Sequence, residues 1–295
     1  MKKLFSVLLV AGLAFVATPA AAHDEEKLNV VASFSILGDM VSQVTGDLAE
    51  VTTIVGPDAD AHIYTPSAGD AKAVANADVI FVNGLGFETW SDTLIETSGT
   101  EAEVFVATEG VTPLMVEGET DPHAWNALTN GMIYVDNIAS AMADVDPDHA
   151  AIYQANAEAY KERLADLHEH ALDAFGKLPD DHRTVVTAHD AFGYLADAYD
   201  LTFLAPVGID TEAEPSAQEL AALIDHLNEQ GAGALFVENI TSPALVEQIE
   251  RETGLEIGGR IYSDALSERG GPATSYEAMF QHNLDVLIQA LSVQS

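Results

Sequence analysis

Residues 148–176 read DHAAIYQANAEAYKERLADLHEHALDAFG, and this run predicts one long, nearly uninterrupted helix. No glycine or proline interrupts it before Gly176 and Pro179. At about 1.5 Å per residue the helix spans roughly 40 Å, which is long enough to run along two lobes as a strut. Its buried face is predicted from positions spaced three or four residues apart, namely Tyr153, Asn156, Tyr160, Leu164, Leu167, Ala171 and Phe175.

On both sides of this helix, apolar β-rich runs alternate with helical patterns, which predicts parallel βαβ units. The predicted strands are 28–35, 51–56, 78–83, 103–107, 184–188, 201–207, 234–238 and 255–262. The other predicted helices are 67–77, 132–143, 192–199, 216–229, 243–253 and 275–291. We therefore expect an α/β protein with two (β/α)4-type lobes, each with a parallel sheet, joined by one long rigid helix. The expected boundaries are 23–130 for the N-terminal lobe, 131–179 for the helical connection and 180–295 for the C-terminal lobe.

The first 22 residues have the pattern of a secretion signal, with Lys2 and Lys3 before an apolar run and small residues at 20–22. No later apolar run reaches spanning length, so we expect no membrane insertion. The chain contains no cysteine, which argues against disulfides, thiolate metal ligands and lipid attachment through an N-terminal cysteine. We therefore expect a free periplasmic protein that carries no lipid.

The charge balance is strongly acidic, with 48 acidic against 11 basic residues and a formal net charge of −37. The negative electrostatic potential of such a protein repels nucleic acid and anionic lipid, so we expect neither as a partner. The same charge favours a monomer. It also predicts a salt-rich source, because dissolved ions screen the repulsion within the chain.

Four side chains could hold one metal ion, because each lies just past an apolar, strand-like run: His62, His123, His189 and Asp264. Ligands of open α/β sheets gather outside the carboxyl ends of the strands. Three imidazoles and one carboxylate suit a divalent transition metal, zinc above all.

Each of these residues also has an ordinary structural interpretation as a solvated loop histidine, a packed core histidine or a turn aspartate. Asp121, or a backbone carbonyl, could hold the second ring nitrogen of His123, and Asp190 is placed to cap a helix or to support His189. The other histidines lie in acidic helices or loops, or at position 23, and are weaker candidates.

Several segments together resemble the substrate-binding proteins of bacterial ABC importers for zinc and manganese. The resemblance covers essentially the whole chain after the signal. It is carried by Pro57-Asp58 before His62 and Pro66, by 83–90, 121–125, 189–194, 236–239 and 262–266.

This resemblance implies two α/β lobes joined by one long helix, with the metal ligands at His62, His123, His189 and Asp264. It also implies an ABC membrane permease as partner, a periplasmic metallochaperone as a candidate donor, and no catalytic activity. Manganese members often carry glutamate in place of His189, so the resemblance implies zinc, with manganese as the alternative. Many zinc members carry a histidine-rich loop where residues 112–120 are short, acidic and free of histidine.

Three other functions stay open at this point. The first is a secreted zinc hydrolase with three histidines and a water, in which Asp264 or Glu238 would be the general base. The second is a binding protein for an iron chelate or corrinoid, which the small number of lysines and arginines disfavours. The third is an adhesive surface role, which the absence of a lipid anchor disfavours.

Overall fold

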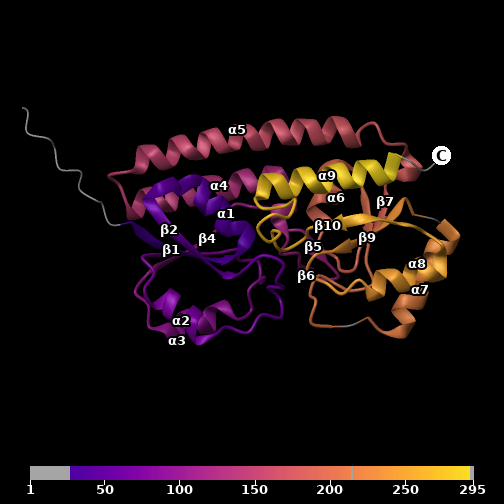
Figure 1. Ribbon diagram of the computed structural model, residues 1–295, viewed down its shortest axis with the longest axis horizontal. Coiled ribbons are helices and arrows are strands. Elements are labelled where there is room, and N and C mark those ends of the chain that lie inside the picture. Colours follow the sequence, from indigo (N-terminus) through magenta and orange to yellow (C-terminus); the bar gives the residue numbers. More distant parts are fainter. Residues whose placement is uncertain (1–26, 214, 231, 293–295) are drawn as a thin grey trace, which may run out of the picture.

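The computed structural model describes residues 27–213, 215–230 and 232–292. The predicted secretion signal at 1–22 lies outside the described residues. Two four-stranded parallel sheets occupy opposite ends of an elongated molecule, and the long helix α5 (Ala150–Phe175) runs along both of them (Figure 1). This arrangement confirms the predicted fold class of two parallel-sheet lobes joined by one helix.

The first sheet has the strand order β2-β1-β3-β4, and every neighbouring pair is parallel. The central strands β1 and β3 are nearly continuous apolar runs, as is typical of parallel strands covered on both faces. Helices α1 and α4 lie on one side of the sheet and α2 and α3 on the other (Figure 1). The elements are β1 (Leu28–Phe34), α1 (Ser35–Thr45), β2 (Ala49–Val55), α2 (Ala68–Ala75), β3 (Val79–Val82), α3 (Ser91–Ser98), β4 (Glu103–Val106) and α4 (Leu128–Val145).

The second sheet has the order β10-β9-β7-β8 and is also parallel throughout. Helices α6 and α9 lie on the side of α5, whereas α7 and α8 cover the other side (Figure 1). Ser216 and Glu219 form the predicted capping box at the start of α7, with reciprocal hydrogen bonds of 2.8 and 3.2 Å. The elements are β7 (Thr184–Val186), α6 (Gly193–Tyr199), β8 (Thr202–Leu204), α7 (Ala217–Gln230), β9 (Ala234–Glu238), α8 (Ala244–Thr253), β10 (Ile257–Ile261) and α9 (Tyr276–Ser292).

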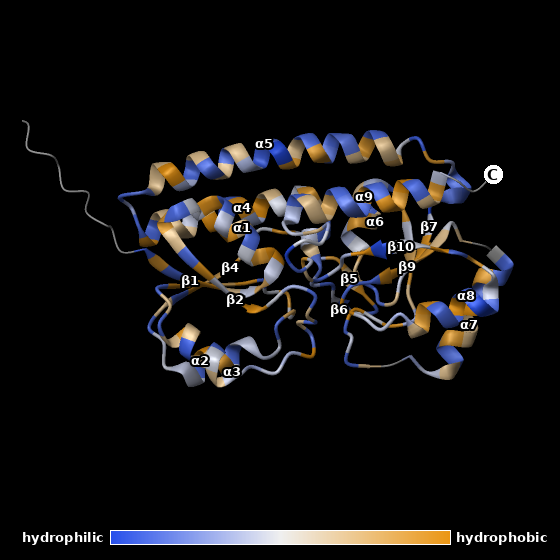
Figure 2. Cartoon of the chain, viewed as in Figure 1, coloured by the Kyte–Doolittle hydropathy of each residue, from blue (hydrophilic) through white to orange (hydrophobic). Residues whose placement is uncertain are grey.

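Helix α5 has 26 residues, so it is about 39 Å long. It packs against α1 and α4 of the first lobe and against α9 and α6 of the second. Hydrophobic and hydrophilic patches alternate along it (Figure 2). Its buried face is the predicted one, except that Ala157 is buried and Asn156 is only partly buried. The side-chain amide of Asn156 donates to the carbonyl of Val44 at 2.9 Å. One long helix therefore contacts both lobes.

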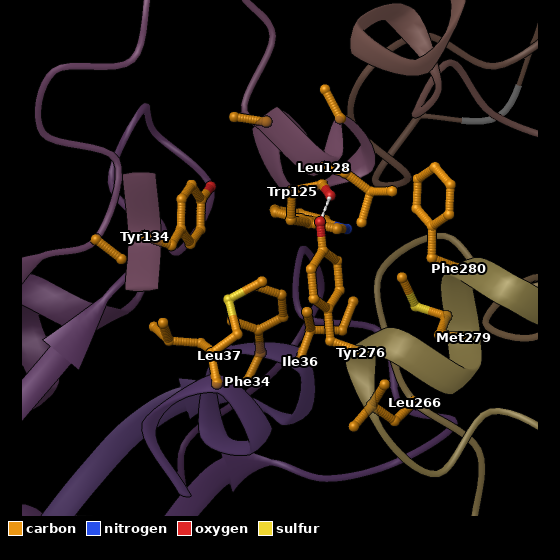
Figure 3. Packing of buried hydrophobic residues seen from close by; sticks show 14 of the residues in the cluster. Phe34, Ile36, Leu37, Trp125, Leu128, Tyr134, Leu266, Tyr276, Met279 and Phe280 are labelled. Atoms are coloured by element: carbon orange, nitrogen blue, oxygen red, sulfur yellow. Dashed lines mark hydrogen bonds between the residues drawn. The ribbon is translucent and has the colours of Figure 1, made fainter. Parts of the chain in front are cut away.

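A continuous apolar core crosses the junction between the lobes. Figure 3 shows its centre, where Trp125 and Phe34 of the first lobe meet Tyr276 of α9. The hydroxyl of Tyr276 donates to the carbonyl of Trp125 at 2.6 Å. A Cβ at Gly131 would lie only 2.4 Å from that hydroxyl, so glycine is required there. Burial of such large aromatic side chains holds the lobes together as one body.

Some elements differ from the sequence-based prediction. Strand β8 ends at Leu204 rather than at 207, because Pro206 has no N–H for a ladder; Val207 makes only an isolated bridge with His189. Helix α4 begins at Leu128 instead of 132. Helices α1 and α3 lie between predicted strands, but their bounds were not predicted, and neither was a short hairpin. The hairpin is formed by β5 (Met115–Val116) and β6 (Glu119–Thr120) within the acidic 112–120 loop. Among the described helices, none is long and apolar enough to cross a membrane.

Candidate metal centre

The four candidate residues come together in the structure. His62 lies between β2 and α2, His123 lies between β6 and α4, His189 lies between β7 and α6, and Asp264 lies between β10 and α9. One ligand atom from each lies within 4.8 Å of the corresponding atoms of the other three. His62 is 6% exposed and the other three are 0% exposed. The two lobes therefore contribute two donors each to one buried point.

The spacing of the donor atoms can be compared with that around a metal ion. Nε2 of His62 lies 3.3 Å from Nε2 of His123. Nε2 of His62 and Nε2 of His189 each lie 3.2 Å from Oδ2 of Asp264, and Nε2 of His123 lies 3.7 Å from Oδ1. A tetrahedral zinc ion with bonds of about 2.0–2.1 Å would hold neighbouring donors about 3.3–3.4 Å apart. Three of these four distances match that spacing, and the fourth is longer by a few tenths of an ångström.

Three of these five donor atoms lack hydrogen bonds. Both carboxylate oxygens of Asp264 and Nε2 of His189 are buried without a hydrogen bond of acceptable geometry, although they lie close enough to form ion pairs. Buried polar atoms in folded proteins are nearly always paired, because leaving them unpaired is costly. Short distances without good hydrogen-bond angles are expected of donors directed at a shared cation rather than at one another.

Asp121 orients His123, as the sequence predicts. Its Oδ1 lies 2.8 Å from Nδ1 of His123 and also accepts the backbone N–H of His123 at 2.9 Å. An N–H on Nδ1 leaves the lone pair of Nε2 free for a metal. The rings of Trp125 and Phe87 lie edge-on to His123, with centroids 5.4 and 6.0 Å away, and keep the ring in an apolar wall.

Glu238 orients His189, a role that the sequence analysis missed. Its Oε2 lies at an ion-pair distance of 2.6 Å from Nδ1 of His189, although neither atom has a hydrogen bond of acceptable geometry. Its Oε1 accepts the backbone N–H groups of Ala188 and His189 at 2.9 Å each. These two bonds explain why β7 ends at Val186 rather than at the predicted residue 188. The signal in the sequence was a glutamate at the carboxyl end of the buried strand β9, although we considered it only as the base of a hydrolase.

Asp190 does not have the role that was predicted for it. Helix α6 begins three residues later, at Gly193, with Phe192 at its N-cap and no side-chain cap. Glu238 rather than Asp190 lies beside Nδ1 of His189. Burial, followed by the nearby charge of Asp121, raises the pKa of Asp190 above its ordinary value.

The charges of the site shift its protonation in the metal-free protein. Burial lowers the pKa of His189, but the carboxylates of Glu238 and Asp264 outweigh it and raise that pKa well above its ordinary value. Burial raises the pKa of Asp264, but the neighbouring His123 and His189 hold it well below its ordinary value. Asp264 is therefore an anion at neutral pH, ready to pair with a cation.

The loop of His62 is tied to the second lobe. The backbone N–H of His62 donates to Oδ1 of Asp60 at 2.9 Å, and the hydroxyl of Thr211 donates to Oδ2 of Asp60 at 2.7 Å. A hollow of about 520 Å³ opens here between the lobes, and Asp60, Ile63, His189 and Thr211 are among the residues that line it. Of the four candidate ligands, His189 is the one that lines this hollow.

Within the described ranges, no other group of three or more histidine and acidic side chains is spaced to hold a metal. Several of the weaker candidate histidines have other contacts there. His168 contacts the hydroxyl of Tyr199 at 2.9 Å, and His282 contacts the carbonyl of Arg260 at 3.0 Å.

Comparison with known proteins agrees with this geometry. Residues 30–290 match the family model described as zinc-uptake complex component A, periplasmic. The manganese-binding lipoprotein MntA of Halalkalibacterium halodurans is 34% identical over 299 residues, which cover 99% of this chain and 100% of that protein. The solved periplasmic zinc binding protein TroA from Treponema pallidum has a TM-score of 0.86 at 28% identity, covering 90% of this chain and 99% of that chain. The manganese-bound periplasmic metal binding protein from Candidatus Liberibacter asiaticus has a TM-score of 0.82 at 30% identity, covering 90% of this chain and 100% of that one.

The comparison corrects one prediction. The absence of cysteine led us to expect a protein that carries no lipid, but relatives that match over their full length are named lipoproteins, which contradicts that expectation. The error was to infer the absence of an anchor from the absence of one residue type. A location outside the cytoplasm fits these relatives as well.

The family match spans both sheets, the linking helix and all four converging residues, and the relatives match over nearly the whole chain. A substrate-binding protein of an ABC importer requires a membrane permease as its partner. The chain belongs to the family of periplasmic substrate-binding proteins of metal ABC transporters, which bind a metal ion for import and are not enzymes.

Proposed function

We propose that this protein captures one zinc ion outside the cytoplasm with His62, His123, His189 and Asp264 and delivers it to its permease. The observation that supports this proposal is the convergence of four buried donors, two from each lobe, within 4.8 Å of one another. The ion is the cargo of the protein, so its binding and release are the function.

Zinc is favoured by the chemistry of the donors. Three neutral imidazoles suit zinc better than manganese, which prefers oxygen ligands. A divalent ion with the single carboxylate of Asp264 leaves one net positive charge. The carboxylates of Asp121 and Glu238 lie directly behind two of the imidazoles and offset that charge. Such carboxylate–histidine pairs also make the imidazole a stronger ligand.

Manganese is the second candidate, and one observation favours it. Both oxygens of Asp264 are unpaired and near the histidines, so the carboxylate could bind through both oxygens and provide five donors in total. A higher coordination number with more oxygen suits manganese. The relatives named for manganese are consistent with this alternative.

The hydrolase alternative does not fit the same geometry. Four protein ligands complete a tetrahedral zinc shell, whereas a catalytic zinc keeps one position for water. Glu238, the candidate base, lies beside Nδ1 of His189, accepts two backbone N–H groups and is only 1% exposed, so it is not available to a substrate.

The test is elemental analysis of protein purified without added metal, followed by equilibrium competition between zinc and manganese. We expect one ion per chain, with zinc bound more tightly. His189→Ala should lose this ion, and His226→Ala should keep it, because His226 is exposed on α7 and removes a histidine without touching the site. A full complement of metal in the His189 variant would refute the proposal.

A further inference from the structure

Asp58 lies four residues before His62 and fastens the loop of that ligand to the second lobe. Its backbone N–H donates to the carbonyl of Leu266 at 2.9 Å. Its carboxylate accepts the backbone N–H of Glu268 at 3.1 Å on Oδ2 and the amide of Asn239 at 3.0 Å on Oδ1. We call these three hydrogen bonds the clasp.

The clasp joins the segments that carry or support three of the four donors. Leu266 and Glu268 lie two and four residues after Asp264 in the chain. Asn239 follows Glu238, the residue that orients His189, and its amide also donates to the carbonyl of Ala265 at 3.1 Å. A single exposed aspartate therefore connects the loop of His62 with the segment that carries Asp264 and with the end of β9, which carries Glu238.

The backbone of Asp58 indicates that the contact is specifically built. Asp58 has φ +52°, in the left-handed region that residues other than glycine rarely adopt. Aspartate tolerates this region better than most residues, and such conformations persist where the surrounding contacts hold them. The left-handed turn directs both the N–H and the carboxylate of Asp58 at the second lobe.

The clasp lies at the surface, whereas the donors lie behind it. Asp58 and Glu268 are exposed, while His123, His189 and Asp264 are fully buried. Exposed hydrogen bonds can be exchanged for bonds to another protein or to water at little cost, which buried bonds cannot. This exposed contact between the lobes is thus also one that holds the loop of His62 close to the segment of Asp264.

We propose that Asp58 is a positioning residue for metal retention, and that opening of its clasp allows the ion to leave. This inference rests on the proposed function of zinc capture. Asp58 does not touch the ion. It keeps the His62 loop closed, so that all four donors are present together; when the clasp opens, His62 moves away and three donors hold the ion less long.

The experiment measures zinc release from the full chain into an excess of chelator, together with the melting temperature of the metal-free protein. Asp58→Gly keeps the left-handed backbone and removes both side-chain bonds, so release should become about tenfold faster. Asn239→Ala should act in the same direction. The matched control is Asp200→Gly, because Asp200 also has a left-handed φ of +56° but ends α6, away from the donors. This control should release zinc at the rate of the unmodified protein.

A further variant separates positioning from general stability. Asp58→Asn tolerates the same backbone and keeps one acceptor oxygen, so its release rate should lie between those of the unmodified and glycine proteins. The inference is wrong if Asp58→Gly and Asn239→Ala release zinc at the unmodified rate. It is also wrong if Asp58→Gly lowers the melting temperature while release is unchanged. Metal binding by the unmodified protein is measured before any variant is made. If that protein binds neither zinc nor manganese, the proposed function fails, and the variants are not needed to show it.

Discussion

Replacing Glu238 by glutamine should weaken metal binding strongly even though the side chain keeps its size and shape. Oε1 of Glu238 accepts two backbone N–H groups, so a glutamine must keep its oxygen in that place. Its NH2 group then faces Nδ1 of His189, where Oε2 now lies 2.6 Å away. A donor there requires Nδ1 to be the acceptor, which moves the ring proton to Nε2 and blocks that atom as a ligand.

Two responses to this substitution can be compared in energy. If the amide rotates to keep the original tautomer, two buried N–H groups lose their acceptor at about 1–3 kcal/mol each. If the tautomer changes instead, the ion loses His189 unless the ring proton is displaced. Changes to groups that orient a ligand typically cost 10- to 100-fold in metal affinity, or about 1.4–2.7 kcal/mol. The tautomer change is the cheaper response, so we expect a loss near 100-fold.

The assay is competition for zinc with a coloured chelator, with the melting temperature of the metal-free protein as a check of folding. Glu256→Gln is the matched control, because it makes the same change of charge on an exposed residue of the same lobe. The control should bind as the unmodified protein does. A folded Glu238→Gln protein that binds zinc within about twofold of the unmodified protein would show that Glu238 does not set the tautomer of His189.

Four more predictions follow from the site and the fold. His189→Glu should shift the preference toward manganese relative to zinc in equilibrium competition, because it exchanges an imidazole for an oxygen ligand; an unchanged preference would exclude His189 as a ligand. Zinc affinity should fall as the pH drops, because protons compete for three imidazoles; since the metal-free pKa of His189 is raised, the loss should begin above the reference value of about 6.5, and a flat profile from pH 7.5 to 5 would contradict it. Sodium chloride should raise the melting temperature, because its ions screen the repulsion among the acidic side chains of a chain with a net charge of −37. A melting temperature that does not respond to salt would remove the argument for a salt-rich source. Solution scattering should be similar with and without metal, because α5 and the shared core hold both lobes in place. A large compaction on metal binding would contradict the view that α5 keeps the lobes at a fixed separation.

Most of the fold could be predicted because its signals are local. The buried face of α5 repeats along one continuous segment, and β9 was predicted with its observed bounds from five consecutive residues. The ends of β7 and β8 were less accurate, because they depend on other parts of the molecule. Strand β7 stops where a glutamate from β9 takes its N–H groups, a contact between residues 49 and 50 positions apart.

The same distinction between local signals and contacts of distant residues explains which parts of the site could be predicted. The convergence of His62, His123, His189 and Asp264 could be predicted because carboxyl ends of parallel strands meet at one edge of each sheet. Asp121 could be recognised as the partner of His123 because it lies two residues away. Glu238 and the clasp could not be recognised, since the bond between Asn239 and Asp58 joins residues 181 positions apart. Such pairs are specified only once the lobes are packed.

The donors are fastened unequally, and this difference bears on how a tightly held ion can leave. Asp121 and Glu238 hold His123 and His189 through buried contacts of 2.8 and 2.6 Å, and the indole N–H of Trp125 anchors the Asp264 segment by donating to the carbonyl of Ser263 at 2.8 Å. Rearranging any of these would separate buried polar groups from their nearest polar partners.

His62 differs, because its loop is held by exposed bonds of Asp58, which water or another protein can replace, and by part-buried bonds of Asp60. It is also the only one of the four with any exposure, at 6%. The pathway of lowest cost therefore begins with His62, while Asp264 and the two remaining histidines stay in place. Capture can be tight and release still rapid, because binding requires all four donors, whereas release requires the movement of one loop.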